Sequence, residues 1–235
     1  TNHRNELIII DLDKKKKVKL DVSDHGRIRD VNWSPDGKWL VYTYRNTPAS
    51  SVIRLIRLST RQKTDLTNTV RYDHSAVFSM DGLFVYFAGE REFLAQYDAQ
   101  LFDMSFAYST RLYAISLLKS QRNPFTYEKK REEEDSDENS DEDSDKKKKP
   151  KLIKIDLDSI QDRILQLPLP VGSYSGLNAA KEELLYYSSI RDLKSVGGDG
   201  EKTKLMSFDF NKLVSSTVLS EVDHYCLSMD RKKMA

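Results

Sequence analysis

The sequence has a single cysteine, Cys226, and only four histidines among 235 residues. One cysteine excludes an internal disulfide framework and fits a reducing, cytoplasmic compartment. No apolar run approaches the roughly 20 residues that span a bilayer, and the first residues lack the apolar stretch of a signal peptide. The formal net charge of +1 at pH 7 gives no argument for a nucleic acid or a membrane as partner.

Patterns that mark catalytic or ligand-binding sites are also scarce. No histidine has a second His, Cys or Glu at metal-ligand spacing, so we expect structural or exposed roles for His3, His25, His74 and His224. No serine lies in a Gly-x-Ser-x-Gly motif, and Gly197–Gly200 lacks the Lys-Ser/Thr of a phosphate-binding loop. Cys226 has apolar neighbours, which favours a buried, inert thiol. The sequence therefore predicts no catalytic residue, no cofactor and no metal.

What the sequence does contain is a repeated hairpin. In the first copy, Trp33 closes an apolar run, Ser34–Gly37 has the composition of a tight turn, and Trp39–Tyr44 is a second run. An Asp-Gly pair between runs of aromatic and β-branched residues is a strong hairpin signal, because glycine adopts positive φ without a Cβ clash. The unit returns in Ser75–Ala88, with Asp81-Gly82 in its turn, roughly 45 residues later.

A second pattern repeats in register with the first. A buried-strand segment followed by a short turn and a return strand occurs at Leu7–Asp13, Ile53–Ser59, Leu152–Asp158 and Leu205–Asn211. A four-strand unit that recurs every 40–50 residues is typical of propeller blades. The sequence predicts an all-β fold: a partial β-propeller of about four four-stranded blades, some incomplete, forming an open segment of a larger propeller.

The later hairpins are weaker. Ala180-Lys181-Glu182 and Asp230-Arg231 stand where the earlier copies have Asp-Gly. We expect Tyr225–Arg231 to form a further innermost strand, and the chain stops where the next strand should begin. The chain also lacks a starting Met, which favours a fragment or a processed product.

Two insertions interrupt the period. About Lys119–Lys149 is low-complexity, nearly all Glu, Asp and Ser from Glu132 to Asp145 and then lysines. Such a segment cannot bury enough apolar area to offset its ordering entropy. We therefore divide the chain into blades at 1–118, a disordered acidic and lysine-rich insertion at 119–150, and blades at 151–235 that are truncated at the C-terminus. The insertion is either a solvated linker, dispensable for folding, or a docking tail for a basic partner in which Ser140 accepts a phosphate.

The other insertion, Glu90–Thr110, joins the second and third strands of one blade. Its aromatic residues, Phe93, Phe102 and Phe106, favour a loop that caps the end of the blade. Alternatively, Arg91 or Arg111 lies at a channel mouth and contacts peptide carboxylates or carbonyls, because guanidinium groups bind such oxygens strongly. These two arginines are the candidate site residues.

Several stretches taken together resemble the second β-propeller of the tricorn protease family. They are Phe78–Gly82, Gly89–Phe93, Tyr97-Asp98, Phe102-Asp103, Thr110–Tyr113, Ile155–Arg163, Leu167–Pro170 and Gly172–Tyr174. The resemblance implies a non-catalytic propeller that routes peptides to and from a serine protease core, beside a PDZ domain. The family's catalytic motifs have no counterpart in this sequence, so the resemblance transfers no catalytic residue.

The resemblance also implies the partners: peptides as substrates of the parent enzyme, and the remaining protease and PDZ domains. The sequence leaves open whether the chain forms a homo-oligomer. The alternative hypothesis is a stand-alone interaction propeller, or the regulatory propeller of a prolyl-oligopeptidase-like hydrolase. Sequence beyond Ala235 would separate the two, because a PDZ-like module favours the first and a Gly-x-Ser-x-Gly hydrolase domain favours the second.

Overall fold

The computed structural model describes residues 1–68, 71–92, 96–98, 103–105, 109–121, 123, 125, 152–180, 184–190, 203–228, 231 and 233–235, with the backbone alone at 96–98, 103–105 and 190. Among these residues the only helix is a single short 3-10 turn, η1 (Ile160–Arg163). The all-β prediction is confirmed. The acidic insertion from Glu128 to Lys149 and the glycine-rich stretch Gly197–Gly200 lie outside the described residues.

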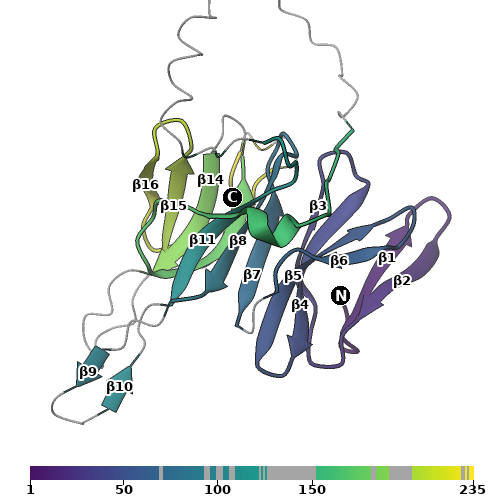
Figure 1. Cartoon of the computed structure of the whole chain (residues 1–235), viewed down its shortest axis with the longest axis horizontal. Coiled ribbons are helices and arrows are strands. Elements are labelled where there is room, and N and C mark those ends of the chain that lie inside the picture. Colours follow the sequence, from purple (N-terminus) through teal and green to yellow (C-terminus); the bar gives the residue numbers. More distant parts are fainter. Residues whose placement is uncertain are drawn as a thin grey trace, which may run out of the picture.

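Three complete four-stranded antiparallel sheets lie side by side (Figure 1). Blade 1 consists of β3 (Arg29–Trp33), β4 (Trp39–Thr47), β5 (Ser50–Arg57) and β6 (Lys63–Asp65). Blade 2 consists of β7 (Asp73–Phe78), β8 (Phe84–Glu90), β11 (Thr110–Ser116) and β12 (Ile164–Gln166). Blade 3 consists of β13 (Ser173–Ala179), β14 (Leu184–Ile190), β15 (Lys204–Asp209) and β16 (Val214–Leu219).

A two-stranded sheet, β1 (Glu6–Asp11) and β2 (Lys16–Val22), precedes blade 1 and corresponds to the outer half of a further blade. The prediction of about four blades, some incomplete, is therefore confirmed as three complete blades and this partial one. The insertion between β8 and β11 contains a separate hairpin, β9 (Gln96–Asp98) and β10 (Asp103–Ser105), which extends beyond the sheets in Figure 1.

In the part of the chain that the structure describes, the core consists of three apolar clusters, each between neighbouring sheets. One lies between β1–β2 and blade 1, one between blades 1 and 2, and one between blades 2 and 3. In the last, the rings of Tyr86 on β8 and Phe210 after β15 stack with centroids 4.8 Å apart. Because both faces of a middle strand are covered, β8 is buried along Phe84–Gly89 rather than at alternate residues.

The hairpin turns are built alike, as the repeat predicted. Ser34 Oγ donates to Asp36 Oδ1 and accepts the N–H of Trp39 at 2.9 Å. Ser79, Asp81 and Phe84 repeat these bonds, again with an N–O distance of 2.9 Å. The glycines that follow the aspartates, Gly37 and Gly82, have φ of 68° and 72°.

The late turn that the sequence marked as weak keeps this geometry. Lys233 N donates to Ser228 Oγ at 2.9 Å, and Arg231 takes the glycine position with φ 55°. The predicted innermost strand at Tyr225–Arg231 is present only as a short hairpin arm, in which Cys226 and Ser228 form backbone hydrogen bonds with Ala235 and Lys233 around the bridge Leu227–Met234; its predicted extent to Arg231 is wrong for the described residues. Cys226 is exposed in this stretch, so the expectation of a buried thiol is also wrong.

The predicted strand at Leu152–Asp158 is wrong as well. The segment crosses the hairpin turn of blade 1, where Ile153 N donates to Asp36 Oδ2 at 3.1 Å, and passes the end of β11 in blade 2, where Asp156 N donates to Leu117 O at 2.9 Å. The third-strand position in blade 2 is already filled by β11, which pairs with β8 and β12. The segment therefore packs Ile155 and Leu157 on the cluster between these blades without joining a sheet.

Candidate functional site on the innermost strands

The first strand of each blade, the innermost strand of a propeller, carries a bulge at an equivalent position. Asp30 on β3, Ser75 on β7 and Gly176 on β13 have φ of 51°, 56° and 62°. The pairing register with the second strand shifts at each of these points. A bulge turns side chains and peptide groups out of the regular ladder, which is why bulges often occur beside binding sites.

Side chains at the bulges join each blade to the next. Asp30 Oδ2 accepts the N–H of Ser75 at 2.8 Å and the hydroxyl of Thr43 at 2.7 Å. Ser75 Oγ in turn accepts the N–H of Gly176 at 3.3 Å. We call these contacts between successive innermost strands the first and second seams.

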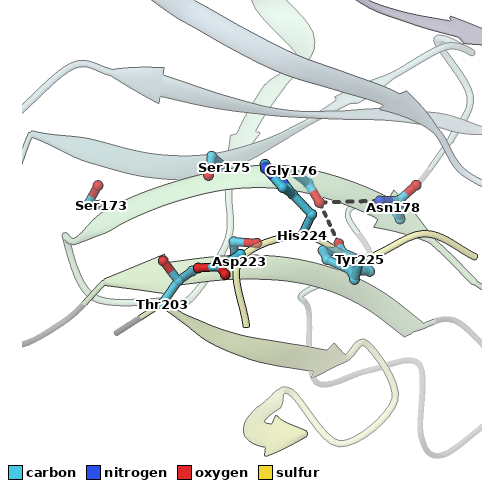
Figure 2. A pocket seen from close by; sticks show the side chains of 9 residues that line it. Ser173, Ser175, Gly176, Asn178, Thr203, Asp223, His224 and Tyr225 are labelled. Atoms are coloured by element: carbon cyan, nitrogen blue, oxygen red, sulfur yellow. Dashed lines mark hydrogen bonds between the residues drawn. The ribbon is translucent and has the colours of Figure 1, made fainter. Parts of the chain in front are cut away.

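The third seam, between β13 and residues 222–228, has a glycine, Gly176, at the bulge. A cavity of about 220 Å³ lies there, lined by Ser173, Ser175, Gly176, Asn178, Ser188, Thr203, Asp223, His224 and Tyr225. Figure 2 shows Asp223, His224 and Tyr225 on one segment that runs along β13. Val222 N holds this segment by donating to Thr203 O at 2.9 Å, and Tyr225 Oη donates to Gly176 O. Burial raises the pKa of Tyr225 to about 12, so its hydroxyl remains a donor at neutral pH.

Arg91, one of the two predicted site residues, lies at the β8 end of blade 2. Its Nε and Nη2 donate to the two carboxylate oxygens of Asp73 at 3.0 and 2.7 Å. Its Cζ lies 4.8 Å from the ring centroid of Tyr113 and 5.2 Å from that of Phe87. Asp73 is fully buried, so this arginine neutralises a buried charge.

Arg111, the other predicted residue, lies at the start of β11 on the same rim. Its Nε donates to Glu92 Oε1 at 2.8 Å and its Nη1 to Leu169 O at 2.9 Å. The structure thus brings both arginines to one end of blade 2 but gives each an intramolecular acceptor. Phe93, Phe102 and Phe106, the predicted cap, lie outside the described residues.

The histidines named from the sequence lie at structural or exposed positions. His74 is half-buried, with Nδ1 3.1 Å from Ser75 Oγ, and burial lowers its pKa. That serine is buried in the second seam and accepts a backbone N–H, so it is placed as a structural hydroxyl. His3, His25 and His224 are exposed. Within the described part of the chain no group of three or more His, Cys, Asp or Glu residues is placed to hold a metal ion.

Sequence reasoning missed Gly176, Asp223 and Tyr225. The signal that could have found them is that Asp30, Ser75 and Gly176 occupy equivalent positions in successive blades. The insertions hide this equivalence, because the spacing is 45 residues for the first pair and 101 for the second.

None of the described helices is long and apolar enough to cross a membrane.

Comparison with known proteins identifies the family. The model of the tricorn protease second beta propeller domain matches residues 1–235. A tricorn protease homolog of Streptomyces coelicolor is 27% identical over 246 residues, covering 99% of this chain and 22% of the homolog. A tricorn protease homolog of Saccharolobus solfataricus is 23% identical over 236 residues, covering 100% of this chain and 20% of the homolog.

A solved structure of the tricorn protease shares the fold, with a TM-score of 0.79 and 18% identity over 99% of this chain and 22% of that chain. The chain thus spans about a fifth to a quarter of the length of its curated relatives. Because the family model covers every residue, the chain belongs to the tricorn protease second β-propeller domain family.

Proposed function

We propose that this chain guides peptides along its innermost strands, as the propeller segment of a tricorn-like serine protease whose catalytic core lies in other domains. The observation that carries the proposal is the exposure of the innermost strands β3 and β13 beside buried second strands; β7 between them is buried except at the partly buried His74. Arg29, Asp30, Val31 and Trp33 on β3 are exposed, as are Ser173, Ser175 and Gly176 on β13. On β4 and β8 the corresponding stretches are buried.

Innermost strands surround the channel of a propeller, so their exposed groups are the ones a passing peptide meets. Bulges there present main-chain and hydroxyl groups, which match the donors and acceptors of a peptide backbone. Such contacts are independent of side-chain sequence and suit a conduit. The role is restriction of access, with the chemical step performed elsewhere.

Arg91 and Arg111 have a second role in this proposal, at the rim where a peptide enters or leaves. The bond to Asp73 uses Nε and Nη2 of Arg91, so Nη1 is the atom through which this arginine would bind a peptide carbonyl. For Arg111 the corresponding atom is Nη2. A compartment that keeps Cys226 reduced, the cytoplasm, is part of the same proposal.

The two tryptophans allow a direct test. Trp33 is 48% exposed on β3, whereas Trp39 is 9% exposed in the core. In a Trp39→Phe variant, an extended peptide of about ten residues, longer than a typical strand, should protect Trp33 fluorescence from acrylamide quenching. A Trp33→Phe variant, which reports through Trp39 alone, should show no change. Equal effects on both, or an effect on neither, would contradict passage along β3.

A further inference from the structure

The third seam differs from the first two by one missing side chain. Asp30 and Ser75 fill their seams with a carboxylate and a hydroxyl that accept N–H groups of the next blade. Gly176 has the same positive φ but no side chain. A Cβ built on Gly176 would lie 3.4 Å from Ser188 Oγ and 3.8 Å from Tyr225 Cε1, between two residues that line the cavity. The glycine therefore contributes directly to the empty space.

The lining of this cavity selects a positively charged, hydrogen-bonding group. Ser173, Ser175, Ser188 and Thr203 supply hydroxyl oxygens that can accept hydrogen bonds. Asp223 is the only Asp, Glu, Lys or Arg among the lining residues, so the formal charge of the lining at neutral pH is negative. Figure 2 shows Asp223 beside Thr203. An ammonium group, with three donors and one positive charge, fits this set of acceptors.

The size of the cavity limits which ligands can fit. About 220 Å³ is below the roughly 300–1,000 Å³ of pockets that enclose a whole small molecule. It suits the end of a longer ligand. A lysine would bury its four-carbon stem along apolar surface, whereas the lining mixes the ring of Tyr225 with hydroxyl groups. The α-ammonium group of a peptide carries its charge beside polar peptide groups and needs no such surface.

We propose that the cavity at Gly176 is a subsite for the free N-terminus of a peptide, with Asp223 and the surrounding hydroxyls holding the α-ammonium group. The inference rests on the proposed function and adds the part of the peptide that is recognised. Asp223 is exposed, so the ammonium remains partly hydrated and binding is weak and readily reversible. Such a subsite orients peptides with the N-terminus at blade 3 without trapping them.

The test compares a short uncharged peptide amide with a free N-terminus, its N-acetylated form, and the acetylated form carrying one lysine. Titrations followed by calorimetry on the 235-residue chain should show about threefold to fivefold tighter binding of the free form. Asp223→Asn should lower that affinity to the level of the acetylated peptide. Asp13→Asn, which removes an exposed carboxylate in the β1–β2 turn, is the matched control and should change nothing.

Gly176→Ser is the second variant. This variant places a serine at a bulge position with positive φ, as Ser75 already does at φ 56°. The distances from its Cβ are ordinary contacts, so the fold should be kept. Thermal melting checks this. The variant should abolish the preference for the free N-terminus. Equal binding of free and acetylated peptides, unchanged preference in both variants, or preference for the lysine peptide would overturn the subsite. Peptides that bind equally yet protect Trp33 would leave the proposed function standing, whereas no effect of any peptide on Trp33 would contradict it.

Discussion

Two buried carboxylates show how single residues fix the blades. Asp73 on β7 is fully buried and paired in bidentate fashion with Arg91, whose guanidinium lies over two aromatic rings. Asp21 on β2 accepts bonds from Tyr42 Oη at 2.8 Å, Lys63 Nζ at 2.7 Å and Arg54 Nη1 at 3.2 Å, all on blade 1. Each carboxylate is stabilised only because its partners offset its desolvation.

Removing one partner of the Asp73–Arg91 pair should be costly. We expect Asp73→Ala to lower the free energy of unfolding by about 3 kcal/mol, because Arg91 is left beside aromatic rings without its anion. Glu92→Ala breaks the more exposed pair with Arg111 and should cost at most about 1 kcal/mol. Urea denaturation measures both. Similar losses in the two variants would show that Arg91 is not held structurally.

Asp21 should make stability depend on pH. Burial alone would raise the pKa of Asp21, but hydrogen bonds from Lys63, from Tyr42 and from the backbone N–H of Val22 outweigh it and lower the pKa. A carboxylate with a lowered folded-state pKa stabilises the fold above its unfolded value, about 3.9, and loses this contribution as pH falls through the folded value. Asp21→Asn should therefore be less stable than the native chain at pH 7, and the difference should shrink below about pH 4. A difference that stays constant from pH 7 to pH 3 would contradict this assignment; Asp13→Asn supplies the baseline.

At the scale of elements, the hairpin turns were predictable and the bulges were not. Asp36-Gly37 and Asp81-Gly82 signal their turns locally, because glycine takes the positive φ that the turn requires. Asp30 and Ser75 take positive φ because hydrogen bonds across the seam hold them there, and no local pattern shows that. Leu152–Asp158 has a strand pattern, but β11 occupies its place in blade 2, so tertiary context overrode propensity.

The same segment gives an element-scale prediction. Gly37 has open space where a Cβ would be, whereas a Cβ on Gly82 would lie 2.5 Å from Ile153 Cδ1. Gly37→Ala should cost about 1 kcal/mol from backbone strain alone. We expect Gly82→Ala to cost about 1 kcal/mol more, because Ile153 must move. In a double-mutant cycle, adding Ile153→Ala should remove the excess. Equal costs for the two glycines would mean that residue 153 does not pack on this turn.

At the scale of the molecule, the blades are held by apolar clusters and by polar seams along their innermost strands. The clusters follow from the repeated strand patterns, so the architecture could be predicted from the sequence. The cavity at the third seam could not be predicted, because it is recognised only when Asp30, Ser75 and Gly176 are compared across three blades. The sequence singled out Arg91 or Arg111 as a channel-mouth residue, but their common rim and their intramolecular acceptors follow only from the structure.

The central claim, a propeller that contacts peptides without cleaving them, can be tested in one experiment. An extended peptide with a central photoreactive residue is incubated with the chain, irradiated, and both products are mapped by mass spectrometry. We expect cross-links on β3 and β13, an intact peptide, and no serine labelled by a fluorophosphonate probe. Cross-links concentrated on the outermost strands β2, β6, β12 and β16, or a cleaved peptide, would contradict the account.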